Sequence, residues 1–153
     1  MEVDVAQNLE FQRRFTGLFK LRFMPRADKA VYYSLMQRVK LAIDHDLAAL
    51  LQEFHEETDR IELSFISKLI AIIDPNKAVW DSIVSGHLAL HLTQPRTVDG
   101  AIAAFGLLCN RMLGMLENGG FVDLQEAYQT RFPHTDHAPM RILDASLWGM
   151  PPA

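Results

Sequence analysis

Residues 101–116 read AIAAFGLLCNRMLGML. Apolar side chains recur in this segment every three to four residues, which is the spacing of one face of an α-helix. We expect a strongly apolar helix here, at the centre of the core. The segment Asn118-Gly119-Gly120 is expected to end this helix, because glycine adopts left-handed backbone at little cost. The positions on the apolar face are Ala101, Ala104, Phe105, Leu108, Met112 and Met115.

The same helical spacing extends outward through most of the chain. Residues 27–57 carry one long helical pattern, and we favour a break near residues 44–46, since about 30 residues is long for a globular helix. Asp59 and Glu62 have the spacing of a capping box that would start a helix reaching Ile73. Asp81 is expected to cap a short helix after a turn at residues 74–77. Shorter helices are expected at residues 123–130 and 141–148.

No stretch shows the alternation of apolar and polar residues that is typical of strands, and no linker separates two cores. The chain of 153 residues has the usual size of one domain. With 49% hydrophobic and 22% charged residues, its composition is that of a globular protein. We therefore predict an all-α fold, a compact single-domain array of six or seven helices over residues 1–153.

Three features bear on the compartment. Cys109 is the one cysteine of the chain, so no internal disulfide can form, and we expect a buried, inert thiol there. The N-terminus begins Met1-Glu2-Val3-Asp4, which is acidic where a signal peptide needs positive charge. No run approaches the roughly 18 to 20 unbroken apolar residues of a membrane span. We expect a cytoplasmic protein with no membrane association.

The formal net charge of −4 is unevenly distributed. Residues 1–40 hold eight Lys or Arg and four acids, whereas residues 41–66 hold seven acids and one Arg. A dedicated nucleic-acid-binding domain is usually basic as a whole, which this chain is not. Its N-terminal part could nevertheless present a local basic face.

The common signature motifs of enzymes are absent from the sequence. It contains no glycine-rich phosphate loop, no cysteine pair with zinc spacing and no His-Glu-x-x-His. His87 and His91 have the helical spacing of half a metal site, which two partly exposed histidines on a helix would also have. Whether they bind a metal is left open, and we assign no metal ligand and no cofactor.

The most specific pattern is LSFISKLIA at residues 63–71, followed after the turn by VWDSIV at residues 79–84. Over residues 61–92 the chain resembles the centre of the helix-hairpin-helix DNA glycosylase superfamily, or of uncharacterised bacterial relatives of it. That superfamily places a lysine on one helix and an aspartate, in a Val-Asp-x-x-Val context, at the cap of the next. Lys68 and Asp81 stand in these places.

The resemblance implies a DNA glycosylase-like, DNA-associated protein. Lys68 would be the nucleophile that attacks the sugar C1′, or a DNA contact, and Asp81 would stabilise the positive charge that develops. The Leu-Pro-Gly-x-Gly hairpin of the superfamily is missing, so the hypothesis includes a catalytically inactive relative. In the alternative interpretation Asp81 is only an N-cap and Lys68 a surface lysine. The expected phosphate contacts are Arg13, Arg14, Lys20, Arg22 and Arg26.

A second hypothesis is a non-enzymatic helical interaction protein that forms a homo-oligomer. Met112 and Met115 lie on one helix, and methionine suits adaptable apolar packing. Aromatic residues are common anchors of protein interfaces. The candidates are Tyr32, Tyr33, Trp80 and Trp148.

Overall fold

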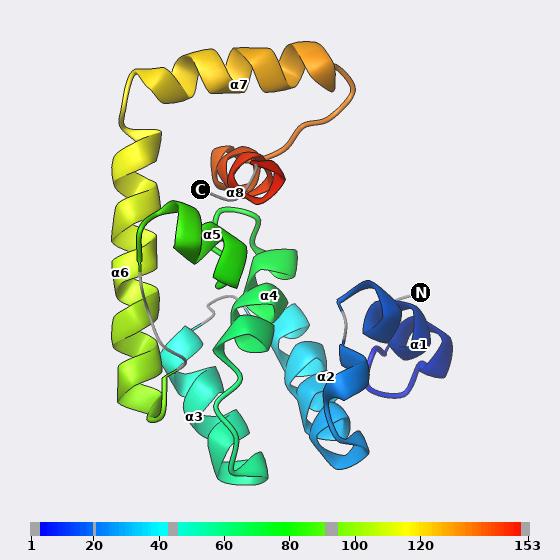
Figure 1. Cartoon of the computed structure of the whole chain (residues 1–153). Helices are drawn as coiled ribbons and strands as arrows, with labels where there is room; N and C mark the ends of the chain where they lie inside the picture. The colour runs from blue at the N-terminus through cyan, green and yellow to red at the C-terminus, as the bar shows by residue number, and fades with distance from the viewer. Residues whose placement is uncertain (1–3, 20, 43–45, 91–94, 151–153) are drawn as a thin grey trace. The chain divides into compact units, whose positions relative to one another are not determined.

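The structure is a computed structural model that describes residues 4–19, 21–42, 46–90 and 95–150. Regular structure in these residues is entirely helical, with eight α-helices and one 3₁₀-helix (Figure 1). This confirms the all-α class, with one α-helix more than the upper expectation. The helices form two compact units, residues 1–62 and residues 63–153, here called the N-terminal unit and the C-terminal unit. The expectation of one domain stays a prediction.

The N-terminal unit contains α1 (Leu9–Leu18), the 3₁₀-helix η1 (Leu21–Phe23), α2 (Arg26–Leu41) and α3 (Leu47–Thr58). The side chain of Asn8 starts α1 by accepting the Phe11 amide, and Asp46 starts α3 by accepting the Ala48 amide. The separation of α2 from α3 confirms the break expected within residues 27–57. Residues 43–45, which include most of the expected break, lie outside the described residues.

Aromatic side chains pack α1 against α2. The ring of Phe15 lies 6.2 Å from that of Tyr32 and 6.0 Å from that of Tyr33, between ring centroids. Phe11 approaches Tyr33 edge-on at 6.4 Å. Such pairs contribute about 0.5–1.5 kcal/mol beyond the area they bury. Leu18 is 76% exposed, so it does not belong to this packed face.

The capping box expected at residues 59–62 is wrong. Asp59 ends α3 instead, in the left-handed region with φ 56°, and its amide donates to the His55 carbonyl. Glu62 accepts from the Arg60 guanidinium at 2.7 Å, and the next helix begins only at Leu63. Aspartate serves at a helix start but also tolerates left-handed backbone, and here the second property determines its place.

The helix end expected at residues 118–120 is also different. The helix stops at Leu116, and no glycine among the described residues has a positive φ. Gly119 is instead the N-cap of the following helix, and the Asn118 side chain before it accepts the Gly120 amide at 3.0 Å. The segment therefore begins one helix immediately after another ends.

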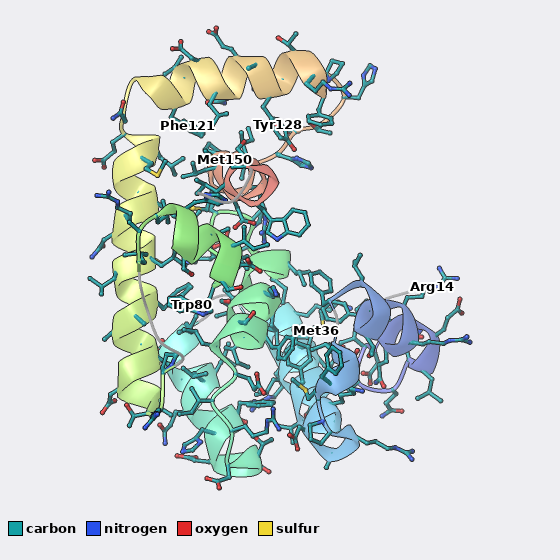
Figure 2. The ribbon with its side chains drawn as sticks, in the orientation of Figure 1. Arg14, Met36, Trp80, Phe121, Tyr128 and Met150 are labelled. Atoms are coloured by element: carbon teal, nitrogen blue, oxygen red, sulfur yellow. The ribbon has the colours of Figure 1, made fainter. Side chains whose placement is uncertain are left out.

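The C-terminal unit contains α4 (Leu63–Ile73), α5 (Ser82–His87), α6 (Val98–Leu116), α7 (Gly120–Arg131) and α8 (Pro139–Gly149). Figure 1 shows α7 crossing the end of α6, with α8 beneath it and next to α5. Phe121 and Tyr128 point from α7 toward α8 (Figure 2). The helix α8 begins two residues before the expected range 141–148 and ends one residue after it.

One apolar cluster holds α5, α6, α7 and α8 together. Leu108 and Met112 of α6 are completely buried, which confirms the expectation that this helix supplies the core. Burial of each such side chain contributes about 1.5–3 kcal/mol. The other buried members are Ala78, Val84, Leu88, Phe121, Met140, Ile142, Leu143 and Leu147.

Among the described helices, α6 alone has the length and composition of a helix that could cross a membrane. Length and composition are the whole basis of that finding. The expectation of no membrane association stays a prediction.

Candidate functional site

Lys68 lies at the edge of the buried face of α4. The neighbouring positions Ser67 and Leu69 are buried, whereas 22% of the Lys68 side chain is exposed. Its ammonium donates to Ser64 Oγ at 3.1 Å, one helical turn earlier. The same Nζ lies 5.9 Å from the centre of the Phe65 ring, within cation–π range. The amine is therefore held in place by its own helix.

Asp81 is positioned by both α4 and α5. The hydroxyl of Ser67 accepts the Trp80 amide at 2.9 Å, which ties the chain before Asp81 to α4. Asp81 then starts α5 as the predicted N-cap, with Oδ1 accepting the Ile83 amide at 2.8 Å. One carboxylate oxygen is thus used by the helix, and the other is left for a second partner.

That second oxygen faces Lys68. Asp81 Oδ2 lies 3.9 Å from Lys68 Nζ, and each of the two side chains is 22% exposed. The structure therefore brings together the two residues that the sequence selected. Both stay accessible from solvent.

Two charged residues of α8 complete the group. Arg141 Nη1 lies 3.6 Å from Asp144 Oδ2, and Nη2 donates to the carbonyl of Ala71 near the end of α4. A cation at this end of a helix is favourable because the last carbonyls lack helical partners. We call Lys68, Asp81, Arg141 and Asp144 the Lys68 cluster.

Asp144 is the most perturbed acid of the cluster. Burial raises the pKa of its carboxyl, the charge of Asp81 raises it further, and the charges of Arg141 and Lys68 lower it. Its Oδ1 atom is buried and has no hydrogen-bond partner among the described residues. A buried acceptor without a partner is rare in folded proteins and calls for an explanation.

Sequence reasoning missed Arg141 and Asp144. The one local signal is an opposite-charge pair three residues apart on a helix that otherwise buries Ile142, Leu143 and Leu147. In chemical terms the cluster combines one amine, one guanidinium and two carboxylates.

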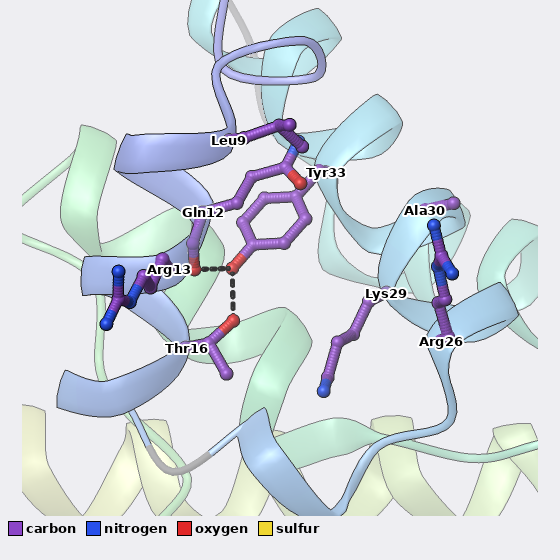
Figure 3. Close-up of a pocket in the computed structure, with 8 residues that line it drawn as sticks. All are labelled: Leu9, Gln12, Arg13, Thr16, Arg26, Lys29, Ala30 and Tyr33. Atoms are coloured by element: carbon purple, nitrogen blue, oxygen red, sulfur yellow. Dashed lines mark hydrogen bonds between the residues drawn. The ribbon is translucent and has the colours of Figure 1, made fainter.

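The residues expected to contact phosphate do not all lie at one place on the N-terminal unit. Arg13 and Arg26 line a pocket between α1 and α2 (Figure 3). Arg14 is on the exposed side of α1, where it pairs with Glu10. Lys20 and the side chain of Arg22 lie outside the described residues.

The remaining candidates from the sequence are histidine and cysteine. His91 lies outside the described residues, so its spacing to His87 stays a sequence observation. No group of three or more His, Cys, Asp or Glu that could hold a metal occurs in the described part of the chain. Cys109 is half-buried, and burial is the main cause that raises the pKa of its thiol.

No protein-family model matches the chain, and no match is found among curated proteins or solved structures. The resemblance over residues 61–92 stays a prediction. Function must therefore be argued from the site.

Proposed function

We propose that this protein is a DNA-associated protein of the glycosylase type, in which the Lys68 cluster meets the target nucleotide. The approach of Lys68 Nζ to Asp81 Oδ2 at 3.9 Å carries this proposal. Glycosylase chemistry of this type needs an amine and a carboxylate within reach of one sugar, and partial burial strengthens both interactions.

The chemistry assigns a role to each member. Once it has lost its proton, the Lys68 amine adds to C1′ of an abasic sugar, water leaves, and a Schiff base forms. The carboxylate of Asp81 offsets the positive charge of the iminium. We propose Asp144 as the acceptor of the Lys68 proton, because its carboxylate lies near enough for the two charges to interact. In duplex DNA the target nucleotide would first have to leave the base stack.

Phosphate contacts belong to the same proposal. They position the DNA without reading its sequence, and they make the affinity depend on salt. The proposed contacts are Arg13, Arg14, Lys20, Arg22 and Arg26.

The Lys68–Asp81 contact also ties α5 to α4, so a test must separate chemistry from structure. Lys68→Arg keeps a positive charge at the site, but a guanidinium stays protonated and cannot form a Schiff base. Lys77→Arg is the matched control, because Lys77 lies in the same unit, is 51% exposed and pairs with Asp74 at 4.0 Å.

The experiment is borohydride trapping on a duplex that contains one abasic site. The wild-type protein and Lys77→Arg should form a covalent adduct, and Lys68→Arg should form none. Equal adduct from Lys68→Arg would assign the reaction to another amine. Absence of adduct from the wild type would remove the nucleophile role and leave Lys68 as a DNA contact.

A specific feature of α6 supports homo-oligomer formation as a second candidate function. Leu107 and Leu113 are 53% and 49% exposed on this helix. Gly106 and Gly114 are exposed on it as well, and a Cβ added at either glycine would meet nothing within 4 Å. Glycine inside a helix costs about 0.5–1 kcal/mol relative to alanine. The described residues give no packing reason for these glycines, whereas close approach of a second copy would.

Light scattering on wild-type protein and two variants tests this candidate. A dimer or larger species should become monomeric in Leu107→Asp. The control Leu9→Asp changes a leucine that is 78% exposed on α1, and it should leave the mass unchanged. A wild-type monomer at all concentrations would exclude this function.

A further inference from the structure

We propose that the pocket between α1 and α2 is a binding site for a phosphate group. The pocket has a volume of about 410 Å³, which is within the range of small-molecule sites. It is large enough for a phosphate together with the group that carries it. The lining residues that matter here are Gln12, Arg13, Thr16, Arg26, Lys29 and Tyr33.

Three cations surround this pocket. Figure 3 shows Arg13 on the α1 side, Arg26 on the α2 side, and Lys29 between the two helices. Guanidinium groups match phosphate oxygens with paired donors, and a lysine adds a compact charge. These cations favour an anionic ligand, and phosphate is the anion that we propose.

The nearby carboxylates are engaged elsewhere. Glu10 of α1 pairs with Arg14, and Asp28 Oδ2 lies 3.6 Å from Arg60 without a hydrogen bond among the described residues. Among the described residues, none of the three pocket cations has an ion-pair partner. The three cations thus form no direct ion pair among the described residues, and Asp28, the acid nearest in sequence to Arg26 and Lys29, lies in the same first turn of α2.

Two of these cations also lie where a helix disfavours them. Arg26 is the first residue of α2 and Lys29 is in its first turn, at the positive end of the helix dipole. The local preference at this end is for anions. A bound phosphate would offset the unfavourable interaction between the cations and the helix dipole, because it would interact favourably with both.

The back of the pocket is fixed by hydrogen bonds. Tyr33 is 2% exposed, and its hydroxyl donates to the Gln12 carbonyl at 2.9 Å. Since that proton is used, the Thr16 hydroxyl, 2.9 Å away, donates to the tyrosine oxygen. The side-chain amide of Gln12 donates to the backbone carbonyls of Val5 and Ala6. The walls that carry the cations are held in place before any ligand binds, which favours affinity.

This inference does not rest on the Lys68 cluster. All pocket residues belong to the N-terminal unit, whereas Lys68 and Asp81 belong to the C-terminal unit. Arg13 and Arg26 are also phosphate contacts of the proposed function, so the inference deepens that part of it. Lys68→Arg should leave phosphate binding unchanged, so failure of the Schiff-base chemistry does not remove the pocket.

The experiment titrates the full chain with inorganic phosphate at constant ionic strength, followed by amide NMR shifts. Shifts should saturate and be largest within residues 9–33. Lys29→Gln and Arg26→Gln should each weaken binding about tenfold, as expected for loss of a charge-assisted contact. Arg38→Gln is the matched control, because Arg38 is also on α2 but pairs with Glu53 outside the pocket. It should change the affinity by less than about twofold.

Two results would overturn the proposal. One is a wild-type titration that never saturates or shifts no amide within residues 9–33. The other is equal weakening in Arg38→Gln, which would mean a diffuse charge effect. A parallel titration with a short DNA oligonucleotide and with glycerol phosphate identifies the source. If the pocket variants weaken the binding of both the oligonucleotide and glycerol phosphate, the pocket accepts nucleic-acid phosphate. If they weaken the binding of glycerol phosphate alone, the ligand of the pocket is a free phosphate ester.

Discussion

Arg13, Arg26 and Lys29 of the N-terminal unit surround a pocket, and among the described residues they have no ion-pair partner. In the C-terminal unit, Lys68 and Arg141 each lie within 4 Å of a carboxylate and are only 22% and 25% exposed. These two groups of cations thus differ in their surroundings, since one lies beside carboxylates and the other lines a pocket without an ion pair.

Whether a cation has a carboxylate partner determines what it can contribute to the protein. A partly buried cation beside a carboxylate contributes to the fold, and its removal leaves a charge uncompensated. A cation without a partner contributes little to the fold and is available for an anion from outside. Removal of a cation should therefore lower stability at Lys68 or Arg141 and have little effect on it at the pocket cations.

The largest effect is expected at Arg141. Arg141→Met removes the contact to the Ala71 carbonyl and the cation beside Asp144, and should lower the free energy of unfolding by about 2 kcal/mol. Arg111→Met, at an exposed position of α6, should stay within about 0.5 kcal/mol of wild type. Urea unfolding measures both. Equal stability of the two variants would show that the Arg141 contacts contribute nothing to the fold.

The pH dependence of stability tests whether the pKa of Asp144 is raised in the folded protein. Its folded pKa lies above the ordinary value of 3.8, so the folded state binds more protons than the unfolded state just above that pH. The contribution of Asp144 to stability therefore falls as pH rises through this window. Asp144→Asn has no such group, so its stability should rise relative to wild type over the same window. Parallel pH profiles in urea unfolding would contradict the raised pKa.

Substitutions of Asp81 separate its two contacts. Asp81→Ala should cost about 1 kcal/mol, because the Ile83 amide loses its N-cap. Asp81→Asn keeps the cap and removes only the charge beside Lys68, so it should be closer to wild type in stability. Thermal unfolding compares the two. If Asn costs as much as Ala, the ion pair rather than the cap supports α5.

The smallest change in stability is expected at Lys29, and it is an increase rather than the loss expected at Arg141 and Asp81. Lys29→Gln should leave stability unchanged or raise it by about 0.3 kcal/mol, since it removes a positive charge from the first turn of α2. The same change should weaken phosphate binding, which is the usual trade between stability and function. A loss of more than about 1 kcal/mol in urea unfolding would mean that Lys29 has a structural partner.

The sequence predicted local features well. Helical spacing located the helices, since periodicity is a property of nearby residues, and it separated α2 from α3. The resemblance to the helix-hairpin-helix glycosylases, and not the spacing, selected Lys68 and Asp81, which lie 3.9 Å apart. Helix ends were less predictable, as Asp59 shows, because aspartate fits both a helix start and left-handed backbone.

What the sequence missed depends on contacts between distant segments. Asp144 lies more than 60 residues after Asp81, and only the packing of α8 beside α5 brings their charges close enough to interact. Lys29 was not selected as a site residue either. Lys29 lines the same pocket as Arg13 because aromatic side chains pack α1 against α2. This packing cannot be read from the spacing of residues along the chain.

Equilibrium DNA binding across a salt series tests the central claim, that this is a DNA-associated protein, most directly. Fluorescence anisotropy with a labelled duplex that contains an abasic site would give the affinity at each salt concentration. The account predicts binding that weakens steeply with salt, with a log–log slope of about −0.9 for each phosphate contact. The double variant Arg13→Gln/Arg26→Gln should make that slope shallower. No binding at low salt, or an affinity that does not change with salt, would contradict the proposal.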